Sequence, residues 1–138
     1  MGVSGIGRHI ARLLFTVGLS AFVLALTGPD LITNLKVPDQ LGGGQWYSIT
    51  IATRNVGDSF ANNSTTRLEI SENGSTTFRH FSIAGLWANG SAYSYYNYTC
   101  IPGTNYTVTF TSVADYYNTV NESNENNNDR TKNMSCIS

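Results

Sequence analysis

The sequence is poor in charge, in histidine and in long apolar runs. Charged residues are 12% of the 138 residues and the formal net charge is −1, so the chain lacks the basic surface that nucleic acid requires. Neither histidine is placed as a catalytic base, since His9 lies in a basic flank and His80 in a strand-like stretch. No glycine-rich phosphate loop opens a helix. We therefore expect no enzymatic activity, no catalytic residues and no nucleic-acid partner.

Cysteine is also scarce, because Cys100 and Cys136 are its two occurrences. Two thiols without a suitably spaced histidine do not form a zinc site. If the domain is exported, we expect a disulfide between them. It would close a loop of about 36 residues and destabilise the unfolded chain by roughly 4 kcal/mol. Two buried free thiols are the alternative.

A long apolar run occurs only at the beginning of the chain. Residues 13–27 carry no charge and follow a flank that contains Arg8 and Arg12. As a helix this run spans about 22 Å, against about 30 Å for the hydrocarbon core of a membrane. Residues 1–28 are predicted to form one N-terminal hydrophobic α-helix, retained in a membrane or filament core, or to be a cleaved signal peptide. Either reading places residues 29–138 outside the cytoplasm.

Sequons for N-glycosylation are unusually frequent. Chance in a chain with this content of Asn, Ser and Thr predicts about three, whereas eight are present. They begin at Asn62, Asn63, Asn73, Asn89, Asn97, Asn105, Asn121 and Asn133. The first two overlap, so we expect one of them at most to be modified. An Asn-rich composition can create single sequons by accident, but the whole set indicates an exported, glycosylated surface that compensates for the low charge.

Beyond residue 28 the apolar residues follow a period of two. The stretch 45–55 places Tyr47, Ile49 and Ile51 on one face, and the stretch 105–115 repeats the pattern. Further strands are expected at residues 30–36, 65–71, 77–83, 92–100 and 130–136. Glycine and asparagine clusters separate these segments. The pattern predicts an all-β fold, a seven-stranded immunoglobulin-like antiparallel β-sandwich.

Several motifs occur in an order that resembles a known family. "PDLITNLKVP" begins at Pro29, "RNVGD" surrounds Gly57, and "YTVTFTSVAD" precedes the run "NTVNESNENNN" at residues 118–128. This order is similar to that of the CARDB domain, the cell-adhesion-related module of bacterial and archaeal surface proteins. The resemblance covers roughly residues 29–135. It implies a seven-stranded sandwich used for display, spacing or adhesion.

The Asn-rich run at 118–128 has two interpretations. In a sandwich it would connect the last two strands, with Val120 closing the end of the core and polar side chains bonding to exposed backbone groups. A folded loop could also bring together oxygen donors of the kind that calcium requires, although no EF-hand spacing is present. The candidate calcium ligands are Asp115, Glu122, Glu125 and Asn127. No other cofactor is expected.

Tyrosine is concentrated in "YSYYNY" at residues 93–98. Adjacent residues of a strand face opposite ways, so about half of these rings should be buried. Exposed rings could form a platform for carbohydrate, but we favour packing, in the core or against other subunits.

These features together predict an extracellular, non-enzymatic structural protein. The leading hypothesis is a subunit of a glycosylated, pilin-like cell-surface filament, archaeal in view of the sequon density, that self-associates through residues 10–27 and contacts the membrane through its N-terminal helix before assembly. A strand-exchange filament is also compatible with the pattern. The alternative is a membrane-anchored or secreted adhesion module that recognises glycan or a surface protein.

Overall fold

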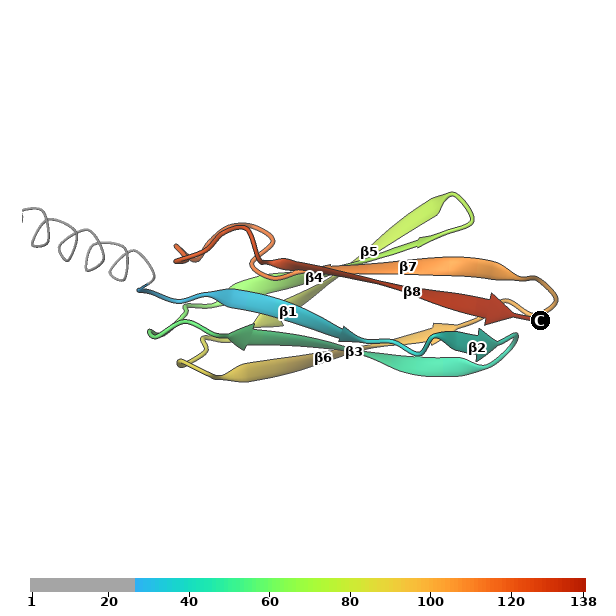
Figure 1. The fold of residues 1–138 in the computed structure, drawn as a ribbon, viewed down its shortest axis with the longest axis horizontal. Helices are drawn as coiled ribbons and strands as arrows, with labels where there is room; N and C mark the ends of the chain where they lie inside the picture. Colours follow the sequence, from blue (N-terminus) through green and yellow to red (C-terminus); the bar gives the residue numbers. More distant parts are fainter. Residues whose placement is uncertain (1–26) are drawn as a thin grey trace, which may run out of the picture.

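The computed structural model describes residues 27–138, which form eight β-strands in two stacked sheets (Figure 1). The strands are β1 (Leu31–Lys36), β2 (Gln40–Gly42), β3 (Trp46–Asn55), β4 (Ser64–Glu72), β5 (Ser75–Ile83), β6 (Ser91–Thr99), β7 (Tyr106–Val113) and β8 (Asp129–Ile137). One sheet has the order β1-β3-β6 and the other the order β2-β8-β7-β4-β5. Within residues 27–138 there is no helix long and apolar enough to cross a membrane.

The core lies between the two sheets and is built by the alternation of each strand. In β3, Ile49 and Ile51 face inward and are fully buried, as are Val108 and Phe110 in β7. The Tyr98 ring of β6 meets the Phe110 ring edge to face, with the ring centroids 5.5 Å apart. Because β-branched and aromatic side chains fill this layer, burial of apolar surface drives the stacking of the sheets.

Two pairs of buried hydroxyl groups cross from one sheet to the other. Thr33 of β1 donates to Ser112 of β7 at 2.9 Å, and the hydroxyls of Thr53 in β3 and Thr66 in β4 are 2.6 Å apart. A buried hydroxyl without a partner would be costly, so each pair offsets the burial of both its members.

A second, smaller apolar cluster closes the end of the sandwich where β1 begins. It consists of Leu31, Ala61, Ala114 and Val120, with Leu86 packed against it. Val120 is buried there, which confirms its predicted place at the end of the core.

The prediction of an all-β sandwich is confirmed, but the count of seven strands is wrong. The seven expected strands occur, each end within two residues of the prediction, and β2 is the eighth. It pairs in parallel with β8, so the sandwich is not purely antiparallel. β2 has only three residues and its partner lies far along the chain, which is why no local period reveals it. The predicted N-terminal helix falls at residues 1–28, and residues 1–26 lie outside the described residues.

Gly57 follows β3 and lies against residues 28–30, the segment that leads into β1. We expect Gly57→Ala to be strongly destabilising. A Cβ at this position would overlap the carbonyl oxygen of Gly28 and stand 2.6 Å from the backbone nitrogen of Asp30. Backbone atoms cannot swing aside, so the entering segment must shift. Chemical denaturation should show a loss of about 2 kcal/mol or more. At Gly42 the added methyl would meet only the flexible Gln45 side chain, so Gly42→Ala serves as the control.

Candidate metal centre

The loop between β7 and β8, residues 114–128, folds over the end of the sandwich. A backbone bond of 2.8 Å from Ala114 N to Asn128 O closes its base. Asp115 and Asn118 adopt positive φ angles of 48° and 53°, which Asp and Asn tolerate better than most residues. The loop is therefore a structured connection, as one of the two interpretations of the sequence predicted.

Asp115 holds the first half of this loop. The residue is only 5% exposed. Its Oδ1 accepts hydrogen bonds from the backbone N–H and from the hydroxyl of Thr119, each at 3.0 Å, and its Oδ2 accepts from Val120 N at 3.0 Å. These bonds fix the turn that places Val120 in the core.

Glu122 connects the loop to the start of β1. Glu122 is only 8% exposed. Oε1 accepts a hydrogen bond of 2.5 Å from Leu31 N, and Oε2 accepts one of 2.6 Å from the side-chain amide of Asn128. A carboxylate from the last inter-strand loop thus binds the first residue of the first strand.

Further bonds join the loop to the segment that precedes β1. Ser123 N donates to Pro29 O at 2.9 Å, and the Asn127 amide donates to the Asp30 carboxylate at 2.9 Å. On the opposite side, Gly28 N donates to Asp58 at 2.7 Å. We call residues 28–31 the entry segment, and it is held from both sides.

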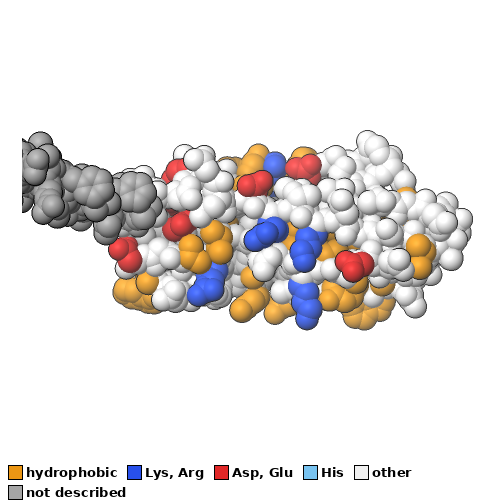
Figure 2. All heavy atoms as spheres, viewed as in Figure 1, with side chains coloured by type: hydrophobic (Ala, Val, Ile, Leu, Met, Phe, Trp, Pro, Cys, Tyr) orange, Lys and Arg blue, Asp and Glu red, His pale blue; other side chains and the backbone are white. Residues whose placement is uncertain are grey.

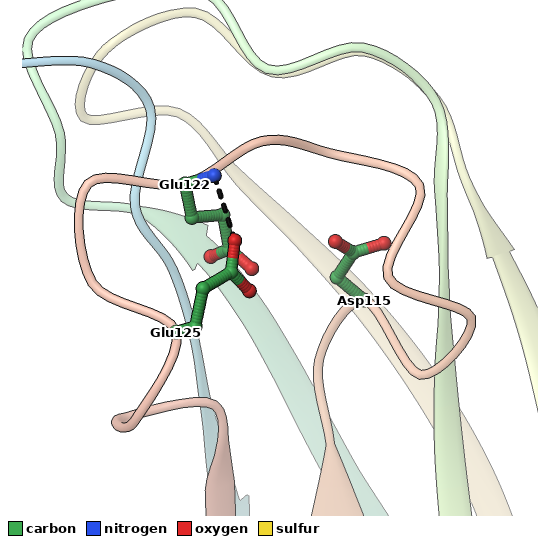
Figure 3. Close-up of side chains that lie close together, drawn as sticks. All are labelled: Asp115, Glu122 and Glu125. Atoms are coloured by element: carbon green, nitrogen blue, oxygen red, sulfur yellow. Dashed lines mark hydrogen bonds between the residues drawn. The ribbon is translucent and has the colours of Figure 1, made fainter.

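Three carboxylates meet inside this loop (Figure 3). Oxygen atoms of Asp115, Glu122 and Glu125 lie within 4.8 Å of one another, and Glu122 N donates to Glu125 at 2.9 Å. Among residues 27–138 no lysine, arginine or histidine forms an ion pair with any of the three. Like charges at this distance repel, so the cluster favours a proton or a cation.

The donor set fits a hard cation. The side-chain oxygens of Asn127 and Asn128 are buried and accept no hydrogen bond in the structure. Asn128 turns its amide nitrogen, not its oxygen, to Glu122. Carboxylate and amide oxygens are the ligands that calcium takes, and each carboxylate has lone pairs beyond those used for N–H groups. Asp115, Glu122 and Glu125 are the residues that could hold the ion.

The pKa of Glu122 is raised from its ordinary value of 4.5 to about 7, and burial is the main cause. The charges of Glu125 and Asp115 also raise this pKa, whereas the hydrogen bonds from Leu31 and Asn128 lower it. The folded state without a cation therefore binds a proton more tightly than the unfolded state does. The resulting stabilisation is complete below pH 4.5 and is lost as the pH rises through 7.

A pH series in the presence of chelator tests this effect. We expect the free energy of unfolding to fall by up to about 3 kcal/mol between pH 4.5 and pH 8, the equivalent of the change in pKa. The variant Glu122→Gln should remove most of that dependence, because the amide cannot ionise and can still accept from Leu31 N. Stability of the native chain that is flat or rising over this range would contradict the assignment.

The sequence identified most of this centre. Three of the four proposed ligands, Asp115, Glu122 and Glu125, are brought together. The fourth, Asn127, turns its amide nitrogen to Asp30 while its oxygen has no donor. Asn128 was missed although it binds Glu122 directly. Its place in an Asn run gave no means of choosing it over its neighbours.

The predicted disulfide is present at the opposite end of β8. Cys100 follows β6 in one sheet and Cys136 lies in β8 of the other, with the Cα atoms 5.6 Å apart and no free cysteine among residues 27–138. Both residues are buried in the core. The bond links the two sheets covalently.

All eight predicted acceptor asparagines are exposed. They lie on both sheets and at both ends of the sandwich. The visible face of the molecule is mostly backbone and side chains that are neither hydrophobic nor charged (Figure 2). At the overlapping pair, the hydroxyl residue of the first sequon, Ser64, is buried, whereas Thr65 of the second is partly exposed. This difference favours Asn63 over Asn62 as the acceptor.

His80 is a cross-strand surface residue, as expected. It pairs with Arg67 of β4, and its ring stacks on that of Tyr117 with centroids 6.0 Å apart. The aromatic run of β6 also divides as predicted: Tyr96 and Tyr98 face the core, while Tyr93 and Tyr95 are exposed.

Comparison with known proteins adds to this description. A family model described as CARDB matches residues 28–132. No curated protein matches the chain.

Among solved structures, the chain is similar to the crystal structure of a CARDB domain from Pyrococcus furiosus in complex with di-metal ions. The two are 26% identical with a TM-score of 0.62, over 79% of this chain and 94% of that one. A solution structure of the same domain gives 24% identity and a TM-score of 0.63, over 80% of this chain and 97% of that one. A β-glucosidase from Listeria innocua shares only the fold, at 8% identity and a TM-score of 0.52, over 80% of this chain and 16% of that one.

Proposed function

The chain belongs to the CARDB family of cell-adhesion-related β-sandwich modules, and from this membership we propose that it is a non-enzymatic module of the cell exterior whose attachment point is reinforced by a bound cation. The observation that carries the proposal is the bond from Leu31 N to Glu122, inside a cluster of three carboxylates. It places the candidate ligands directly against the entry segment.

The cation in question is calcium. A calcium ion would neutralise the repulsion among Asp115, Glu122 and Glu125 and so hold the 114–128 loop against the entry segment. Any pulling force that passes from the N-terminal region into the sandwich crosses this junction. Extracellular calcium modules have dissociation constants of about 0.1 to 1 mM, and an affinity in this range suits a module located outside the cell. The di-metal complex of the Pyrococcus furiosus domain supports a metal role for the family fold.

Thermal or chemical unfolding of the whole chain, purified in detergent, tests the cation directly. With 10 mM calcium in place of chelator, we expect a gain of about 1 to 3 kcal/mol in the free energy of unfolding. Glu125 is exposed and, within residues 27–138, accepts a bond only from Glu122 N, so Glu125→Gln should fold normally and lose most of the gain. Asp39→Asn, at an exposed acid outside the cluster, is the matched control and should keep it. Equal stability with calcium and with chelator would overturn the proposal.

Within this role we propose that the protein is a subunit of a glycosylated surface filament. Residues 10–27 would pack against copies of themselves in the filament core, and the sandwich would form the sheath. The apolar segment of the sequence leads directly into the entry segment, which is held from both sides, and this supports the arrangement. The exposure of all eight sequon asparagines supports glycosylation of the surface. Electron microscopy of native surface material, with its intact mass and N-terminal sequence, tests both parts. Monomeric protein of unmodified mass would contradict them.

A further inference from the structure

The outer face of the sheet β1-β3-β6 carries aromatic rings that the core does not use. Tyr93 and Tyr95 of β6 are 62% and 63% exposed, and Trp46 of β3 is 66% exposed. Their neighbours Tyr96 and Tyr98 face inward, so the outward rings are not needed to fill the sandwich. Figure 2 shows hydrophobic and basic side chains together along the margin formed by β3 and β6.

The charge on this face has one sign. The three strands of the sheet contain Lys36 and Arg54 and no Asp or Glu. Arg54 pairs with Ser91 in the register of β3 and β6, is exposed, and forms no ion pair within residues 27–138. A guanidinium group without a carboxylate partner, beside exposed rings, is suited to an anionic ligand that also presents an apolar surface.

Arg54 and Tyr93 line a hollow of about 280 Å³ on this face. Its lining includes Ile32, Asn34, Ala52, Arg54, Ser91 and Tyr93. The lining therefore combines an aromatic ring and a guanidinium group with amide and hydroxyl groups. The volume suits one or two sugar residues, and it is too small for a peptide helix or a protein surface.

We propose that this hollow binds an acidic saccharide, a glycan that carries a hexuronate carboxylate. Arg54 pairs with the carboxylate, the Tyr93 ring stacks on the apolar face of the sugar ring, and Asn34 and Ser91 bond to its hydroxyl groups. The inference goes beyond the function proposed above and rests on its extracellular location for access to ligands outside the cell. One cation in the lining of the hollow, on a chain of net charge −1, does not form the extended basic track that nucleic acid requires.

Binding of trigalacturonate to the whole chain tests this site. The protein is produced in a host that forms disulfides and adds no N-glycan, because Asn89 also lines the hollow and carries a sequon. Calorimetry should show that trigalacturonate binds at least about tenfold more tightly than its methyl ester, which lacks the charge. Raising the salt concentration should reduce the difference in affinity between the acid and the ester.

Two pairs of variants locate the site. Arg54→Gln should abolish the preference for the acid, and Tyr93→Ala should weaken binding of both forms about tenfold. Arg130→Gln and Tyr117→Ala are matched controls, since Arg130 lies in β8 of the other sheet and Tyr117, 61% exposed, lies in the loop that follows β7. Both should bind as the native chain does.

Three results would overturn the inference: no measurable binding, equal binding of acid and ester, or equally tight binding of a single-stranded oligonucleotide of the same charge. None of them bears on the stabilisation by calcium. Failure of this site is therefore distinguishable from failure of the cation-reinforced junction.

Discussion

Replacing Asn55 with alanine should lower the free energy of unfolding by about 4 kcal/mol. The Asn55 side chain is fully buried and makes four hydrogen bonds. Its oxygen accepts from Asp30 N at 3.1 Å and from Gly57 N at 3.0 Å, and its nitrogen donates to Ser59 O at 2.7 Å and to Leu86 O at 3.0 Å. Truncation leaves Asp30 N, Gly57 N and Ser59 O without these partners, and each loss costs about 1 to 3 kcal/mol unless water enters. Leu86 O keeps its bond from Ala61 N.

The variant Asn55→Asp separates the two halves of this network. The carboxylate can still accept from Asp30 N and Gly57 N, but it cannot donate to Ser59 or Leu86, and it adds a buried charge. We therefore expect it to be about as destabilising as alanine. The Asn34 side chain is exposed and, among the residues that the structure describes, bonds only to the adjacent Leu35 N, so Asn34→Ala should cost less than about 0.5 kcal/mol. A loss below about 1 kcal/mol for Asn55→Ala, measured by denaturant titration, would contradict this account of the junction.

Loss of the disulfide is the second change with a large expected effect. The bond between Cys100 and Cys136 spans 36 positions of the sequence and connects the two sheets through the core. Restriction of the unfolded chain by a loop of this size corresponds to roughly 4 kcal/mol. The double variant Cys100→Ser/Cys136→Ser should lose at least that amount, because it also places two hydroxyls in an apolar environment.

Reductant distinguishes the crosslink from the packing of the sulfur atoms. Added to the native chain it should lower the unfolding midpoint, and added to Cys100→Ala/Cys136→Ala it should change nothing. If reductant leaves the native midpoint unaltered while free thiols appear, the bond has no part in stability.

The seven longer strands were predictable because the alternation of apolar and polar residues is visible in the local sequence. Ile49 and Ile51, or Val108 and Phe110, alternate with polar residues, and this period follows from the pleat of a strand. β2 was not predicted because three residues are too few to show a period. Its pairing with β8 depends on where the rest of the sheet places β8. Register and sheet order are non-local properties for the same reason.

The candidate centre was predictable in composition but not in its connections. Acidic residues and asparagines in one loop predict the Asp115, Glu122 and Glu125 cluster, since a short loop cannot keep them far apart. The bond from Leu31 N to Glu122 joins residues 91 positions apart, and nothing in either local sequence indicates it. The buried network of Asn55 was likewise beyond the sequence, although "RNVGD" marked its position as part of a family pattern.

The most direct test of the central claim is amide hydrogen exchange of the whole chain, measured by mass spectrometry with calcium and with chelator. If a cation holds the 114–128 loop against the entry segment, calcium should slow exchange about tenfold or more in peptides that cover Leu31, Thr119 and Val120, whose amides bond to Glu122 and Asp115. The turn at residues 73–74, which joins β4 to β5 away from the cluster, should exchange at the same rate in both conditions. Unchanged exchange in the loop and the entry segment would contradict the account.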